Sequence, residues 1–191
     1  MCKMGFSKFQ DSTEEMLPKS TVAEPKEFFY DGVPMITETD LGGRITFVNR
    51  KFTEMSGYAR DELLGRPHSI IRHQDMPAAC FTLMWQTLHE GRNWQGYVKN
   101  CRKDGNFYWV IVHVTPKLLS DQTVGYIAVR KKPELLTIGR IKEVYAQAKL
   151  LEKEGDYLGA KAIVGNTARI GAQSFPQEEF AVYGANALKA V

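Results

Sequence analysis

The sequence contains no long segment that is uniformly apolar or uniformly basic. No apolar stretch is long enough to span a bilayer, and residues 1–10 lack the continuous apolar core of a signal peptide. No segment is rich in lysine and arginine, and the net charge is only +3, which argues against binding to nucleic acid or to an anionic membrane. The sequence therefore predicts a soluble, cytoplasmic protein that does not insert into a membrane.

Patterns for catalysis and for metal binding are also scarce. The three cysteines form neither a metal pair nor a disulfide framework, and the four histidines are too isolated for a metal site. We find no nicotinamide fingerprint, no paired catalytic carboxylates and no nucleophile–base arrangement. We therefore expect a protein of the reducing cytosol that is not an enzyme. The residues concerned are Cys2, Cys80, Cys101, His68, His73, His89 and His113.

What the sequence does contain is an ordered set of short elements. Alternating apolar residues and Gly-containing turns predict strands, and apolar residues three and four apart predict helices. Strands and helices are segregated, which predicts an α+β domain with a five-stranded antiparallel sheet, helices over one face and a pocket between them. The expected strands are 35–39, 45–48, 94–102, 107–118 and 123–130, and the expected helices between them are 50–56, 60–64 and 77–90.

Three regions are predicted along the chain. Residues 1–32 form an N-terminal tail or cap, with one short helix at 13–17, residues 33–132 form the α+β domain, and residues 133–191 form a helical C-terminal segment. In that last segment an apolar stripe is followed by a glycine stop, which predicts further helices at 156–170 and 176–191. The stripe consists of Ile138, Ile141, Tyr145 and Ala148.

Several short sequence motifs in the central region resemble those of PAS domains. A narrower stretch resembles the FAD-binding PAS domain of bacterial aerotaxis receptors over residues 33–131, namely Arg72-His73-Gln74-Asp75-Met76-Pro77 followed by spaced tryptophans. The motifs that resemble PAS domains in general are Ile45-Thr46-Phe47-Val48-Asn49, Ser56-Gly57-Tyr58, Glu62-Leu63-Leu64-Gly65, Lys103-Asp104-Gly105 and Tyr108-Trp109.

The resemblance implies bound FAD and a set of residues around it. Tryptophans would form walls for the apolar ring, asparagines would bond to its mixed donor and acceptor edge, and the arginine and histidine before the helix at Pro77 would bind the pyrophosphate. Asp75 would orient Arg72 or His73, or cap the helix. The cofactor-binding residues implied are Asn49, Arg72, His73, Asp75, Trp85, Trp94, Asn100 and Trp109.

Structural roles compete with these assignments. Asn49 suits a helix cap, Trp85 suits a core stripe with its neighbours, and Arg72 with Asp75 suits an ion pair. A haem-binding PAS domain, with His73 or His89 as ligand, and a cofactor-free PAS module for interaction or dimerisation both remain open. No cysteine follows Gly65-Arg66, where light-sensing flavin PAS domains carry their adduct thiol, so we expect redox signalling without a light-driven adduct.

The expected partners follow from the same resemblance. Aerotaxis receptors continue into a membrane anchor and a long signalling coiled coil, and neither is found in this sequence. The sequence therefore predicts a stand-alone redox or oxygen sensor for energy taxis that signals to a separate membrane chemoreceptor or signalling protein. A homodimer through the helices that flank the PAS domain is a further expectation.

Overall fold

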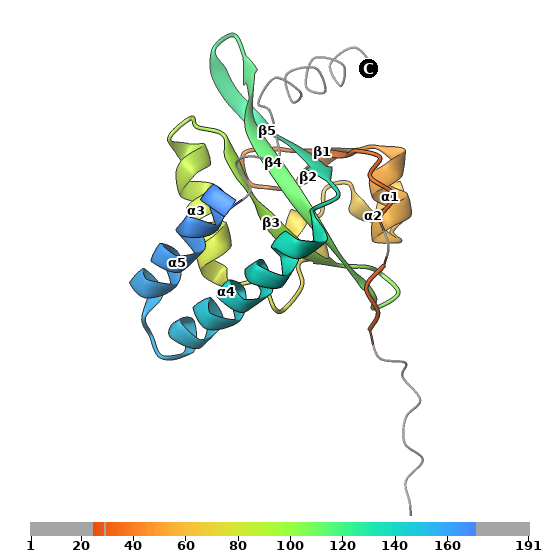
Figure 1. Cartoon of the computed structure of the whole chain (residues 1–191). Coiled ribbons are helices and arrows are strands. Elements are labelled where there is room, and N and C mark those ends of the chain that lie inside the picture. Colours follow the sequence, from red (N-terminus) through yellow and green to blue (C-terminus); the bar gives the residue numbers. More distant parts are fainter. Residues whose placement is uncertain (1–24, 29, 171–191) are drawn as a thin grey trace, which may run out of the picture.

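A computed structural model describes residues 25–28 and 30–170 of the chain. At its centre is an antiparallel sheet of five strands in the order β2-β1-β5-β4-β3 (Figure 1). The predicted fold class, α+β with a five-stranded antiparallel sheet, is confirmed. The strands are β1 (Met35–Thr39), β2 (Ile45–Val48), β3 (Trp94–Cys101), β4 (Phe107–Leu119) and β5 (Gln122–Lys131).

The segment between β2 and β3 holds the helices that cover one face of the sheet. Asn49 caps the first of them and Gly57, at φ 75°, ends it, as the turn chemistry of these two residue types favours. The other helices also begin and end within two residues of the prediction, except for a short 3₁₀ helix, η1, that the sequence pattern did not indicate. They are α1 (Arg50–Ser56), α2 (Arg60–Leu63), η1 (His68–Ile71) and α3 (Ala78–His89).

Cross-strand pairing divides the strand residues between two faces. Asn100 lies opposite Tyr108, and Lys99 lies opposite Trp109. Directly opposed residues point to the same side of a sheet and successive residues to opposite sides, so the first pair and the second pair lie on different faces. We call the first the helical face, because α1 to α3 cover it, and the second the outer face.

The outer face is covered by a helix from the C-terminal segment. α4 (Leu135–Lys153) and α5 (Tyr157–Ile170) form an antiparallel pair beside the sheet (Figure 1). The predicted apolar stripe is buried in α4, from Ile138 to Ala148. Asp156 caps α5 by accepting a hydrogen bond from the backbone nitrogen of Gly159 at 2.8 Å. The predicted helices at 13–17 and 176–191 lie outside the described residues.

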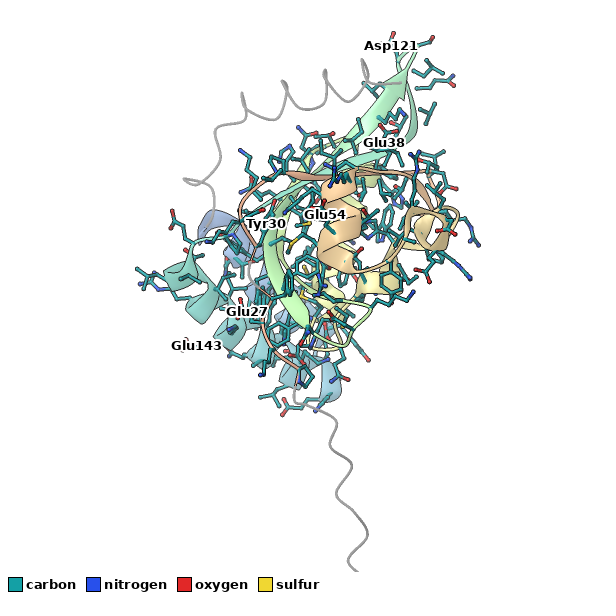
Figure 2. All side chains as sticks on the ribbon, turned by 90° about the vertical axis from the view of Figure 1, so that its right-hand side faces the viewer. Glu27, Tyr30, Glu38, Glu54, Asp121 and Glu143 are labelled. Atoms are coloured by element: carbon teal, nitrogen blue, oxygen red, sulfur yellow. The ribbon has the colours of Figure 1, made fainter. Side chains whose placement is uncertain are left out.

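The β4–β5 hairpin extends beyond the rest of the sheet, with Asp121 at its tip (Figure 2). Ser120 and Asp121 both have positive φ, which is the backbone that a tight hairpin turn requires. Among the described residues no helix combines the length and the apolar character needed to cross a membrane.

Candidate functional site

Two adjoining hollows lie between α3 and the helical face of the sheet. Their volumes are about 220 Å³ and about 70 Å³, and they share four lining residues, Gly43, His68, Met84 and Trp85. The larger hollow also reaches Phe81, Arg72 and Asn100, and the smaller one reaches Tyr126, Ala128 and Arg130 on β5. This is the pocket between sheet and helices that the order of elements predicts.

Trp85 forms the apolar wall of both hollows. Its ring packs edge-on against Tyr126 of β5, with 5.4 Å between ring centroids. The turn between β1 and β2 closes over the same ring, because a Cβ atom added to Gly43 would lie 3.1 Å from Trp85 Cζ2. Gly43 also has a φ of +76°, so both its backbone and the tryptophan beside it favour glycine at this position.

A buried arginine stands at the end of the smaller hollow. Arg130 is only 5% exposed, and no carboxylate among the described residues lies within ion-pair distance of it. Its guanidinium donates hydrogen bonds to Thr37 Oγ1 at 3.0 Å and to His68 Nε2 at 2.8 Å, and it lies over the ring of Phe52. Burial lowers the pKa of Arg130 to about 10, so the side chain remains a cation at neutral pH.

His68 is the neutral partner of that cation. Arg130 can only donate, so His68 Nε2 must be an unprotonated acceptor and the ring proton must be on Nδ1. Burial, reinforced by the charge of Arg130, lowers the pKa of His68 to about 3. The residue is half-buried and lines both hollows.

Two donors on the helical face lack partners. The amide nitrogen of Asn100 and the hydroxyl of Tyr108 are buried, and neither makes a hydrogen bond within the described part of the chain. Burial raises the pKa of Tyr108 to about 12, and the charge of Arg130 and the neighbouring Asn100 side chain lower it only in part. Because an unsatisfied buried donor is costly, the Asn100 amide at the wall of the larger hollow is suited to bind a ligand acceptor.

Arg72 lies at the mouth of the larger hollow. Its guanidinium is stacked 3.7 Å from the centre of the Phe81 ring, and its backbone pairs with that of Asn100 at the edge of the sheet. The residue is exposed. A planar cation held flat on an aromatic ring at an opening is suited to bind a phosphate group.

His73 and Asp75 line neither hollow, and Asp75 ties their loop to β3. The Asp75 carboxylate lies 2.6 Å from Lys99 Nζ, and its backbone nitrogen donates to His73 Nδ1 at 3.1 Å. Burial lowers the pKa of His73, so this imidazole accepts that bond in its neutral form. Asp75 thus pairs with Lys99 rather than with Arg72.

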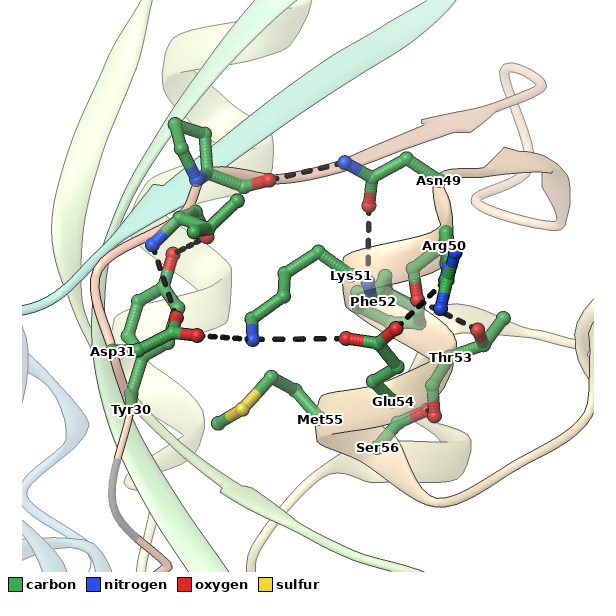
Figure 3. Close-up of polar contacts among 12 residues, drawn as sticks. Tyr30, Asp31, Asn49, Arg50, Lys51, Phe52, Thr53, Glu54, Met55 and Ser56 are labelled. Atoms are coloured by element: carbon green, nitrogen blue, oxygen red, sulfur yellow. Dashed lines mark hydrogen bonds and ion pairs between the residues drawn. The ribbon is translucent and has the colours of Figure 1, made fainter.

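Asn49 is fully engaged as a structural cap (Figure 3). Its side-chain oxygen accepts hydrogen bonds from Ile36 N at 3.1 Å and Phe52 N at 3.0 Å, and its amide nitrogen donates to Pro34 O at 3.0 Å. It does not line either hollow. In this structure Asn49 therefore acts as the N-cap of α1.

The three tryptophans do not form one pocket. Trp94 lies on the helical face above Gly96, where a Cβ atom would come 2.5 Å from its ring, but it lines neither hollow. Trp109 lies on the outer face, where its ring centroid is 6.2 Å from that of Tyr145 in α4. Of the three tryptophans, only Trp85 lines the hollows. The sequence did not distinguish them, because residue type alone does not tell which face of a helix or strand carries a side chain.

A larger cavity of about 370 Å³ lies on the outer face, between the sheet and α4. Its three lysines already have partners in the protein: Lys99 pairs with Asp75, Lys142 lies 3.8 Å from Glu27, and Lys149 donates to the backbone oxygen of Gln74. The indole nitrogen of Trp109, which also lines this cavity, has no hydrogen-bond partner among the described residues. The hollows under Trp85 combine such a donor, the Asn100 amide, with the buried cation of Arg130, which has no carboxylate in ion-pair distance in the described part of the chain, and this combination makes them the candidate site.

Arg130, His68 and Tyr126 are site residues that the sequence reasoning missed. A usable signal existed for two of them. Tyr126, Ala128 and Arg130 alternate along the predicted strand 123–130, and they include an arginine on the same side as buried residues. His68 had no such signal, because η1 places it and the sequence pattern does not indicate that element.

The chemistry of the site fits a flavin, although its volume is small. Asn100 and Arg130 offer donors to the ring edge, Trp85 and Tyr126 offer apolar surface, and Arg72 offers a cation to the phosphates. Hollows of about 220 Å³ and 70 Å³ are smaller than the roughly 300–1,000 Å³ of typical ligand pockets. A flavin would therefore not fit these hollows as they stand.

Comparisons with known proteins find similarity in the central region of the chain. A family model described as "PAS fold" matches residues 45–129. The aerotaxis receptor of Escherichia coli is 39% identical over 115 residues, which cover 60% of this chain and 23% of the receptor. The nitrogen fixation regulatory protein of Klebsiella pneumoniae is 32% identical over 83 residues, which cover 44% of this chain and 17% of that protein.

Among solved structures, the light state of the blue-light photoreceptor Aureochrome1 LOV is 22% identical with a TM-score of 0.49, and the match covers 63% of this chain and 90% of that one. The chain spans less than a quarter of each of the two curated relatives. The five-stranded antiparallel sheet, the helices inserted between β2 and β3, and the family match together establish that the region from β1 to β5 has the PAS fold.

Proposed function

We propose that this chain is a cytoplasmic, FAD-binding sensor of redox state or oxygen that signals to a chemotaxis receptor or a similar partner. The observation that carries the proposal is Arg130, a buried cation with no carboxylate within ion-pair distance among the described residues, at the end of an apolar hollow. The similarity to the aerotaxis receptor over 115 residues supports the same role. The proposed role is signalling rather than catalysis.

The chain's own residues divide the work of holding such a cofactor. FAD, when bound, supplies a reversible change of electron number and ring charge. Trp85 and Tyr126 would enclose the ring, the Asn100 amide would donate to its edge, and Arg130 would face it with a fixed positive charge. Arg72 would hold the phosphates at the mouth.

The purified protein is expected to be yellow and to release FAD on denaturation. The measurement is an absorption spectrum of the protein as isolated, followed by chromatography of the released cofactor. A colourless protein that also fails to take up added FAD would refute the proposal, and a haem Soret band would show that the cofactor is of a different kind.

A cofactor-free PAS module for protein interaction is the second candidate, and the small volume of the hollows favours it. The same spectrum separates the two functions. Under this second candidate the hollow is simply an imperfectly packed part of the core, and added FAD gives no saturable change in absorption or fluorescence.

Illumination of the flavin-loaded protein is expected to give no thiol adduct. Cys80 lies in α3 but its thiol is buried against Tyr145, with 3.7 Å between Sγ and the hydroxyl oxygen, and it lines neither hollow. Burial raises the pKa of Cys80 to about 12, so the reactive thiolate is not formed at neutral pH. A blue-light bleach that recovers in the dark, and that disappears in Cys80→Ala, would contradict this expectation.

A further inference from the structure

Helix α3 begins without a cap from its own sequence. Pro77 occupies the N-cap position and offers no side-chain acceptor. The backbone nitrogen of Ala79, which has no acceptor within the first turn of the helix, donates to Glu152 Oε1 at 2.8 Å. Glu152 belongs to the last turn of α4, 73 residues further along the chain. A carboxylate at this position satisfies one of the unpaired N–H groups and lies at the positive end of the helix dipole.

A second contact ties the same two helices together. Tyr145 of α4 is only 3% exposed, and its hydroxyl donates to the backbone oxygen of Tyr97 in β3 at 2.7 Å. The same hydroxyl lies against Cys80 in the first turn of α3. α5 continues along α3, where a Cβ atom on Gly165 would lie 4.0 Å from Leu83 Cδ1. The α4–α5 pair therefore reaches from the outer face of the sheet around β3 to α3.

The other side of α3 forms the wall of the hollow. Phe81, Met84 and Trp85 follow within two turns of the residues that contact α4. A helix of twelve residues packed on both sides responds as one body, because packed side chains leave it few intermediate positions. A ligand that displaces Trp85 outward therefore also displaces the helix start held by Glu152.

We propose that α3 couples the hollow to the α4–α5 pair, and that Glu152 is the positioning residue that sets the coupling. The proposal rests on the proposed function in one respect, that the ligand in the hollow is a flavin. Coupling between two sites is reciprocal, so loosening the Glu152 contact must change ligand affinity, and changing the hollow must change the order of α4.

The first test replaces Glu152 with alanine and uses Glu143→Ala as the control. Glu143 is an exposed glutamate of the same helix, at the outer edge of the fold (Figure 2). Titration with FAD is expected to give a dissociation constant changed by about threefold to tenfold in Glu152→Ala, the size of one lost cap, and unchanged in Glu143→Ala. Equal affinity in both variants and in the wild type would overturn the coupling.

The second test needs no flavin, so its failure is separate from failure of the proposed function. Hydrogen exchange is measured on the flavin-free protein and on Trp85→Phe and Trp85→Ala, with circular dichroism to confirm folding. Both variants are expected to exchange faster in residues 149–156, although these lie outside the hollow. Wild-type exchange rates in this segment for a folded Trp85 variant would overturn the proposal, even if FAD binds as expected.

Discussion

Replacing Arg130 with methionine is expected to lower the reduction potential of the bound flavin by about 30–65 mV for a two-electron couple, which corresponds to about 1.5–3 kcal/mol for a charge-assisted contact. The cation lies at the end of the hollow with no carboxylate in ion-pair distance within the described chain. Such a charge favours whichever state of the ring carries more negative charge, which is the reduced one. Its removal therefore makes reduction harder.

Arg72→Met is the matched control for this prediction. Arg72 is also an arginine beside the hollow, but it is exposed and stacked on Phe81 at the mouth, where it would meet phosphates whose charge does not change on reduction. Its loss is expected to weaken FAD binding about tenfold in both redox states and to leave the potential almost unchanged. An unchanged or raised potential in Arg130→Met would contradict the placement of the ring against Arg130.

The flavin-free form of Arg130→Met gives an independent measurement. Burial lowers the pKa of Arg130 to about 10, so below that pH the folded state holds a cation that the unfolded state holds more easily. Removing this cation is stabilising, and it is offset by the lost hydrogen bonds to Thr37 and His68. We expect the free energy of unfolding in urea to stay within about 1 kcal/mol of wild type or to rise.

The strands and helices were predictable because their signals are local. Asn49, Gly57 and the Asp104-Gly105 turn fix the backbone where they stand, and every strand and α-helix between residues 35 and 131 that the sequence predicted begins and ends within two residues of its expected place. The apolar stripe from Ile138 to Ala148 predicted burial of α4, and it is buried. Periodicity alone did not reveal which surface the stripe covers.

The membership of the candidate site was less predictable, because it depends on which face carries a residue. Trp85 and Trp109 are equal as residue types, yet the strand register sends Trp109 to the outer face and only Trp85 to the hollow. His73 and Asp75 belong to the same short word as Arg72, but the loop turns them toward Lys99. Arg130 was missed because a buried arginine without a carboxylate partner is rare and has no sequence motif.

Acidification is expected to unfold the flavin-free protein more steeply than its carboxylates alone would allow, because His68 is held neutral. The pKa of His68 is lowered to about 3 in the folded state, against 6.5 for a free histidine. Between these two values the unfolded chain binds a proton that the folded chain does not. Stability from this residue is therefore complete above pH 6.5 and is lost by about 1.4 kcal/mol per pH unit as the pH falls toward 3.

The window from pH 6.5 to 5 isolates the histidines from the acidic groups. Asp31, Glu62, Asp75 and Asp104 have pKa values lowered below those of free carboxyl groups, so their contributions are lost only at more acidic pH. Burial also lowers the pKa values of His73 and His113, so these two residues add to the slope in the same window. The His68 contribution must therefore be read as a difference between variants.

His68→Gln supplies that difference, because the glutamine oxygen can still accept the hydrogen bond from Arg130 but has no proton to gain. Urea unfolding at pH 6.5, 6.0, 5.5 and 5.0 is expected to show a slope smaller than that of wild type by up to one proton, about 1.4 kcal/mol per pH unit. His89→Gln, at an exposed position of α3 outside the Arg130 contact, is the control for the substitution itself. Equal slopes for wild type and His68→Gln would show that His68 takes up its proton in the folded state. The neutral pair between His68 and Arg130 at the end of the hollow would then be wrong, because a protonated imidazole has no lone pair to accept from a guanidinium.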